Sequence, residues 1–221
     1  MIAARSRAGR LGGFTLIELL VAITIMALMA VLGWRGLDGM LRAQAQTSQH
    51  SDELLTLQAG LVQWKLDLDK LVQIQGVNSL DWDGRVLRIS RQASPVGDGV
   101  VVVAWTRRAD SGGQWLRWQS PAVHTTQAWR EAWGQASAWA KNPGPDQRLN
   151  EVLVVPLKDW EITYFRSNTW TNALSSDGNL SNGTQTVPEG IRLVLTLPAE
   201  QALGGKLTID WVRPDLSGNG S

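Results

Sequence analysis

The stretch Gly13–Leu20, which reads GFTLIELL, opens an apolar run that lasts to Trp34. A helix of about 20 residues crosses the roughly 30 Å hydrocarbon core of a bilayer, so residues 14–34 are predicted to form a transmembrane helix. One carboxylate, Glu18, lies close to the start of this run. A charge inside a membrane costs roughly 3 kcal/mol, so its presence there indicates a functional role.

The position of a cleavage site separates a secretory signal, a permanent membrane helix and a prepilin leader. An ordinary secretory signal is cut after its apolar region, at a site of small residues. Beyond Leu32 the chain reads GWRG, without an Ala-x-Ala pattern. Cleavage is therefore expected before the apolar run, which favours a prepilin leader.

The residues from Gly13 to Glu18 resemble the type III signal of type IV pilins and type II secretion pseudopilins. The resemblance implies that a prepilin peptidase removes residues 1–13 by cutting between Gly13 and Phe14, and that Phe14 is then N-methylated. It also implies that Glu18 meets the terminal amine of a neighbouring subunit during assembly. In a low-dielectric layer an ammonium and a carboxylate attract strongly, and each offsets the desolvation of the other.

Positive charges are gathered before the apolar run, at Arg5, Arg7 and Arg10, whereas only Arg35 and Asp38 follow it closely. The positive-inside rule then places the leader in the cytoplasm. The chain is therefore expected to cross the cell inner membrane once and to be surrounded by membrane lipid before assembly. The remainder of the chain is expected in the periplasm.

The segment Trp34–Arg42, WRGLDGMLR, resembles a stretch of the J-type minor pseudopilins of type II secretion. Two later stretches, Trp170–Asn172 and Val187–Leu193, are also similar to that family. The resemblance implies assembly with I-type and K-type minor pseudopilins, and with the H-type, in the tip complex that initiates a pseudopilus. Such a pseudopilus exports folded proteins across the outer membrane.

An amphipathic helix is predicted over residues 35–75, and apolar residues at regular spacing form a stripe along its second half. Between residues 33 and 53 the sequence leaves open whether the helix breaks, because glycines and small or polar residues dominate there. We expect the stripe to pack on the protein's own sheet, with three further residues, Leu55, Val62 and Leu66, broadening the same face. The stripe consists of Leu54, Leu57, Leu61, Trp64, Leu68 and Leu71.

Residues 76–221 are predicted to form an antiparallel, β-rich globular head, which makes the whole chain an α+β protein with a pilin-like fold. An Asp83-Gly84 turn predicts a hairpin between residues 80–82 and 85–91. Further strands are predicted over residues 100–107, 114–119, 151–155, 160–166, 191–197 and 206–212. The tryptophan-rich segment 125–148 departs from the family pattern, and its first part is predicted to be a helix covering the sheet.

The composition excludes several kinds of function. The 221 residues carry a formal charge of +1, but without the three arginines of the leader 18 basic side chains face 20 acidic ones, so no nucleic-acid surface is expected. There is no cysteine, and His50 and His124 have no second ligand at metal-binding spacing, so neither a metal nor a cofactor is predicted. Asp67 and Asp69 lie about 200° apart on a helix and are expected to be solvated. No catalytic constellation is present, so we expect a protein that is not an enzyme.

Two other functions stay open on the sequence. A minor pilin of a type IV pilus or of a DNA-uptake machine shares the same leader, but usually lacks the phrase at Trp34–Arg42. A membrane-tethered periplasmic enzyme is disfavoured by the missing catalytic residues.

Overall fold

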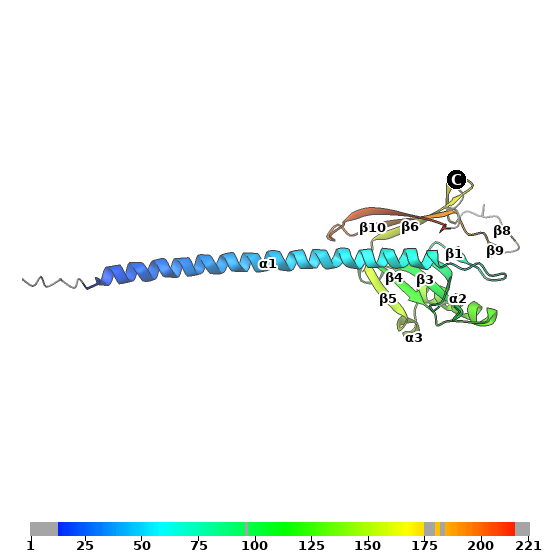
Figure 1. Ribbon diagram of the computed structural model, residues 1–221, viewed down its shortest axis with the longest axis horizontal. Coiled ribbons are helices and arrows are strands. Elements are labelled where there is room, and N and C mark those ends of the chain that lie inside the picture. Colours follow the sequence, from blue (N-terminus) through cyan, green and yellow to red (C-terminus); the bar gives the residue numbers. More distant parts are fainter. Residues whose placement is uncertain (1–12, 96, 175–179, 182–183, 215–221) are drawn as a thin grey trace, which may run out of the picture. The chain divides into compact units, whose positions relative to one another are not determined.

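The structure is a computed structural model that describes residues 13–95, 97–174, 180–181 and 184–214. Of the predicted leader, only Gly13 falls within these residues. The chain divides into two compact units, Met1–Gln49 and His50–Ser221, and the second is called the globular unit below. The predicted architecture is confirmed: a long N-terminal helix with an apolar first part is followed by antiparallel β-sheets, in an α+β pilin-like arrangement (Figure 1).

Helix α1 (Leu16–Asp69) is one continuous helix of 54 residues, without a break between residues 33 and 53. Its first part is apolar and long enough to cross a membrane. The helix ends at Asp69, earlier than the predicted residue 75. The reason is that the following residues join strand β2 (Val86–Gln92): Leu71 pairs with Arg91, and the amide of Val72 donates to the Ser90 carbonyl at 2.9 Å.

The first sheet has five antiparallel strands in chain order, β1-β2-β3-β4-β5. Its central strand, β3, is buried at six consecutive positions, as its continuous apolar run indicates. The predicted Asp83-Gly84 turn is confirmed, since the Asp83 side chain accepts the backbone amides of Arg85 and Val86 at 2.9 and 2.8 Å. The remaining strands are β1 (Leu80–Trp82), β3 (Val100–Arg108), β4 (Gln114–Gln119) and β5 (Glu151–Pro156), with a short η1 turn (Asp110–Gly112) between β3 and β4.

The second sheet has the strand order β11-β10-β6-β7, again antiparallel throughout. Its members are β6 (Asp159–Arg166), β7 (Thr169–Asn172), β10 (Gly190–Leu197) and β11 (Gly205–Val212). Strand β7 was not predicted from the sequence. A separate two-stranded pair is formed by β8 (Leu180–Ser181) and β9 (Thr184–Gln185).

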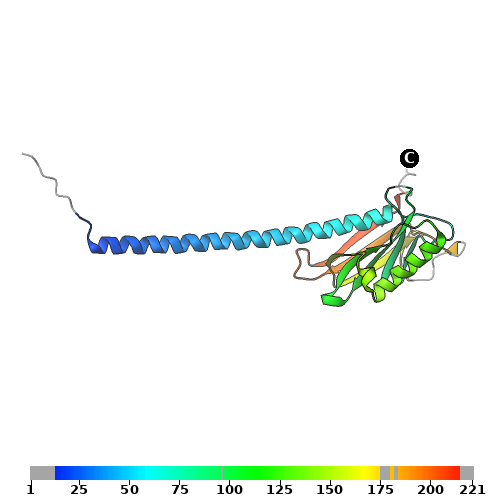
Figure 2. The same ribbon diagram turned by 90° about the horizontal axis from the view of Figure 1, so that it is seen from below.

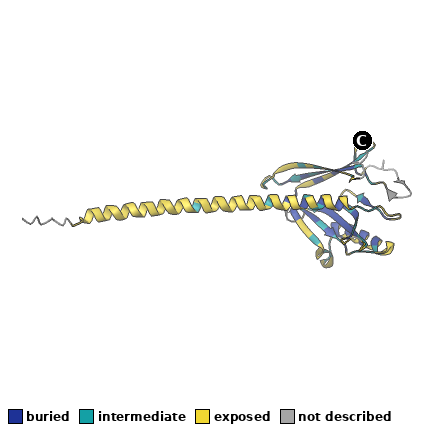
Figure 3. Ribbon diagram, in the orientation of Figure 1, coloured by how far each residue is buried: buried dark blue, intermediate teal, exposed yellow. Residues whose placement is uncertain are grey.

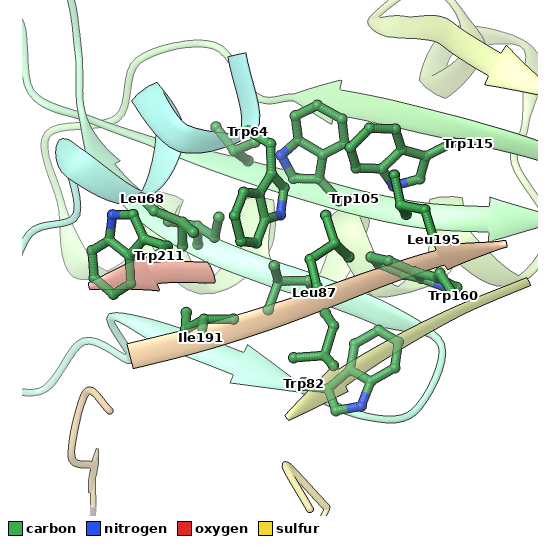
Figure 4. Close-up of a cluster of buried hydrophobic side chains, with 14 of the residues drawn as sticks. Trp64, Leu68, Trp82, Leu87, Trp105, Trp115, Trp160, Ile191, Leu195 and Trp211 are labelled. Carbon is green, nitrogen blue, oxygen red and sulfur yellow. The ribbon is translucent and has the colours of Figure 1, made fainter. Parts of the chain in front are cut away.

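The last part of α1 lies between the two sheets in the globular unit, with β6 and β10 on one side and β3, β4 and β5 on the other (Figure 1). One hydrophobic core joins all three layers, and buried side chains first occur in this part of the helix (Figure 3). The indole rings of Trp64, Trp105 and Trp115 gather around α1, and the Trp105 and Trp115 rings are 4.5 Å apart (Figure 4). Gly60 permits α1 to pack closely against Val154 of β5, because a Cβ there would lie 2.2 Å from Cγ1 of Val154.

Helix α2 (Thr126–Lys141) covers the other face of the first sheet, against β2 and β3 (Figure 2). The predicted helix in the tryptophan-rich segment is confirmed, and Thr125 caps it by accepting the amide of Ala128 at 3.2 Å. Its tryptophans are buried in a second hydrophobic cluster, as expected for a helix lying on a sheet. The segment then continues through the short helix α3 (Pro145–Arg148) into β5.

The apolar stripe of α1 divides into two faces. Leu57, Trp64 and Leu68 are buried, as predicted, while Leu61 and Leu71 pack against the core at partial exposure. Leu54, at the start of the stripe, is 38% exposed. The prediction that three further residues broaden the buried face is wrong: Leu55, Val62 and Leu66 are exposed on a different side of the helix.

Candidate processing and assembly site

The N-terminus of α1 holds Glu18 in a reciprocal cap with Thr15. The backbone amide and the hydroxyl of Thr15 both donate to Oε2 of Glu18 at 2.9 Å. The amide of Glu18 in turn donates to the Thr15 hydroxyl oxygen at 3.4 Å. This is a capping box, which satisfies donors that the first turn of a helix otherwise leaves unpaired.

The geometry of this cap leaves Glu18 open to a second partner. Both Thr15 donors meet the same oxygen, and Oε1 accepts no hydrogen bond within the described part of the chain. The side chain is exposed, and the neighbouring Phe14 is 92% exposed. A cation approaching from outside the helix can therefore pair with Glu18 without displacing Thr15.

Residues 11–34 match the family model of the prokaryotic N-terminal methylation motif. The chain carries a prepilin-type signal. This signal indicates a type IV pilin-like or pseudopilin protein, and the apolar first part of α1 is compatible with a membrane anchor of that class. No curated protein matches the chain. The predicted processing residues Gly13 and Phe14 and the predicted assembly residue Glu18 fall inside the matched range; their roles stay predictions.

A second candidate element is an exposed apolar seam on α1 in the globular unit, formed by Leu55, Ala59, Val62 and Leu66. The spacing of four, three and four residues places them along one line of the helix. Leu55 is 62% exposed, Val62 52% and Leu66 43%. Because a line of this spacing is what a second helix packs against in a coiled coil, the seam is a candidate contact for another α1.

A buried ionic cluster fastens α1 to the first sheet, and it overturns the expectation that Asp67 is solvated. Asp67 has no exposed surface and accepts five hydrogen bonds. Arg117 binds both of its oxygens, at 2.7 and 2.9 Å, and Arg91 donates at 2.7 Å. The indole of Trp105 donates at 2.9 Å, and Gln63 completes the set from the helix itself.

The other carboxylate of the predicted pair, Asp69, is exposed yet also engaged. It accepts the indole N–H of Trp211 on β11 at 2.8 Å and forms an ion pair with Lys65 at 2.8 Å. Asp67 thus binds the first sheet and Asp69 the second, from two sides of α1. The expectation of two different faces is confirmed, but both faces are in contact with sheets.

Among the described residues no group of three or more His, Asp and Glu side chains is placed to hold a metal ion. His50 lies on α1 and His124 just before α2, in different parts of the globular unit. Sequence reasoning missed Thr15 as the partner of Glu18, although the spacing Thr-x-x-Glu before an apolar run is a recognisable capping signal. It also missed the exposed seam, whose four-three-four spacing is visible in the sequence.

Proposed function

We propose that this chain is a J-type minor pseudopilin of a type II secretion system. In this role it is an inner-membrane prepilin with a periplasmic head, and it is not an enzyme. A prepilin peptidase cuts between Gly13 and Phe14 and Phe14 is methylated. The processed chain then joins I-type and K-type minor pseudopilins, and the H-type, in the tip complex that starts the pseudopilus.

The observation that carries the finer assignment is the segment Trp34–Arg42, which resembles the corresponding stretch of J-type pseudopilins. The motif at residues 11–34 supports only the wider class. Two features of the structure fit an assembling subunit: Glu18 has an oxygen open to a neighbour's amine, and the seam offers an apolar line to another helix.

Deletion of the gene and complementation in the native host test the proposal. Loss of the chain is expected to leave folded exoproteins in the periplasm, while surface pili and DNA uptake stay normal. Restoration requires the full chain and fails with Gly13→Val, because a bulky side chain at that position blocks the peptidase. Normal secretion together with lost pili or lost DNA uptake overturns the assignment in favour of a type IV pilus minor pilin.

The processing step has its own measurement. Mass spectrometry of the membrane-derived chain is expected to find methylated Phe14 as the first residue. An intact Met1 terminus in cells that contain the peptidase contradicts the prepilin role altogether.

A further inference from the structure

A charged hollow of about 380 Å³ lies at one end of the first sheet, and it is larger than the two other described pockets, of about 220 and 200 Å³. Its walls come from the β1–β2 turn, the end of β3, the end of α2 and the start of β6. Four basic side chains line it, Arg85, Arg107, Arg108 and Lys141, together with Asp110 and Asp159. None of its lining residues belongs to the N-terminal cap or to the seam.

Three of the four cations have no ion pair within the part of the chain that the structure describes. Arg108 is neutralised by Glu151, whose oxygen lies 2.9 Å from its Nη2. No described carboxylate lies within 4 Å of Arg85, Arg107 or Lys141. Likewise, no described basic side chain lies within 4 Å of Asp110 or Asp159. The hollow therefore keeps positive charge in excess and available to a ligand.

The inner part of the hollow is preorganised. Nε of Arg107 donates to the Leu157 carbonyl at 3.1 Å, which fixes the guanidinium against the β5–β6 connection. The close approach requires Gly113, because a Cβ there would lie 2.9 Å from Nη2 of Arg107 and 2.3 Å from the Leu157 carbonyl oxygen. A cation held in place before binding loses little conformational entropy when an anion arrives.

We propose that this hollow docks an acidic polypeptide segment of a neighbouring protein. The presence of both signs selects a polypeptide over a phosphate group, because Asp110 and Asp159 repel a compact dianion but can face a basic side chain between acidic ones. The exposed Arg85 and Lys141 lie at the edge and steer the segment, while Arg107 anchors it inside. The proposal rests on the proposed assembly function only for the nature of the neighbour, which would be another subunit.

Binding of a fluorescent octaglutamate peptide to the full chain in non-ionic detergent tests the proposal, by anisotropy at low ionic strength. The double variant Arg85→Glu/Lys141→Glu is expected to weaken binding about tenfold or more. The matched control is Arg130→Glu/Lys206→Glu, which changes the net charge equally at exposed positions outside the hollow and is expected to leave affinity within about twofold.

Absence of peptide binding overturns the proposal, and so does equal weakening by the two double variants, which indicates unspecific charge attraction. Displacement of the peptide by inorganic phosphate at matched ionic strength assigns the hollow to phosphate and overturns the polypeptide. The thermal unfolding midpoint of each variant is expected to match that of the unchanged chain, because all four side chains are exposed. The proposed function fails separately, if the unchanged chain is found without processing at Phe14. That result leaves the peptide-binding test intact, because no residue of the hollow lies in the prepilin signal.

Discussion

At the scale of single residues, the Thr15–Glu18 pair explains how a carboxylate is accommodated at the start of an apolar helix. Two donors of Thr15 satisfy one oxygen of Glu18 inside the same chain, so the residue does not depend on a partner to be hydrogen-bonded. The other oxygen accepts no hydrogen bond within the described part of the chain. In the proposed function it pairs with the amine of a neighbouring subunit.

Substitution of Glu18 is expected to separate processing from assembly. Glu18→Ala should be cleaved and methylated normally, because it leaves Gly13 and Phe14 on either side of the predicted cut unchanged, but it should be recovered without partner subunits in cross-linking and co-purification. Thr15→Val removes one of the two donors and leaves the carboxylate, so its co-purification is expected to fall much less. Equal recovery of partners by Glu18→Ala and the unchanged chain contradicts the pairing role.

Asp67 is expected to be the most sensitive carboxylate of the globular unit. Asp67→Ala leaves Arg91 and Arg117, whose side chains are only 11% and 12% exposed, without their anion, so the free energy of unfolding should fall by about 3–5 kcal/mol. The measurement is denaturant unfolding followed by tryptophan fluorescence, since Trp105 contacts the carboxylate directly. The control is Asp146→Asn, at an exposed position, and its free energy of unfolding should stay within about 0.5 kcal/mol of that of the unchanged chain. An equally stable Asp67→Ala chain would show that the cluster adds nothing to stability.

The burial of Asp67 was not predicted because its cationic partners lie 24 and 50 residues away along the chain. One local signal was present. Asp67 follows Trp64 by three residues and precedes Leu71 by four, which places it beside the apolar face of the helix. A charge at such a position is rarely left unpaired, so the pattern by itself indicates a buried ion pair.

At the scale of secondary-structure elements, α1 contributes two different surfaces within the globular unit. The buried face holds the unit together, whereas the seam of Leu55, Ala59, Val62 and Leu66 is exposed, and we propose that it contacts other chains. Acidic substitutions in the seam, such as Val62→Asp with Leu66→Asp, should therefore abolish co-purification of partner subunits. The unfolding midpoint is expected to stay close to that of the unchanged chain, because both side chains are exposed.

The control for this experiment lies on the buried face of the same helix. Leu68→Asp introduces a charge at a position that is 1% exposed, so it should unfold the unit and not merely free it from partners. If the seam variant binds partners as well as the unchanged chain does, the seam is not an assembly contact.

The attachment of α2 is expected to weaken at low pH. Burial raises the pKa of Glu151, but hydrogen bonds from Arg108 and Trp139 and the charge of Arg108 outweigh it, so the pKa lies below its ordinary value. The stabilisation that ionised Glu151 gives to the folded unit is then fully present above the ordinary pKa of about 4.3. It is lost as the pH falls through the lower pKa of the folded state. Unfolding midpoints should fall more steeply below about pH 4 in the unchanged chain than in Glu151→Gln. Parallel pH profiles of the two chains would rule out this contribution.

The elements themselves followed largely from local patterns, and the failures have local causes too. Strands β2, β3 and β4 begin and end within a residue or so of the predicted bounds, because turn residues flank them. Strand β7 was missed because it has four residues and follows a turn at Ser167 and Asn168, both with positive φ, where the sequence lacks the usual glycine. The first sheet keeps its strands in chain order, whereas the pairing of β6 with β10 in the second sheet and the placement of α1 between the sheets depend on contacts far apart in sequence.

At the scale of the whole molecule, every residue of the two hydrophobic cores lies in the globular unit. Of the twelve tryptophans only Trp34 precedes His50. The described residues before His50 contain no buried side chain, so their removal takes nothing away from either core. The energetic basis of folding therefore resides in residues 50–221.

A chain that begins at His50 is accordingly expected to fold without detergent into a soluble protein. Its near-ultraviolet circular dichroism and unfolding midpoint should match those of the full chain, since Trp64, Asp67 and Leu68 keep all their partners on the two sheets. The same chain lacks Phe14 and Glu18, so it should neither associate with membranes nor enter assemblies, although it keeps the seam. A truncated chain that aggregates or shows no cooperative unfolding would mean that the first part of α1 is needed for folding as well as for anchoring. Efficient incorporation into assemblies would instead show that contacts of the globular unit suffice, and would remove Glu18 from its proposed role.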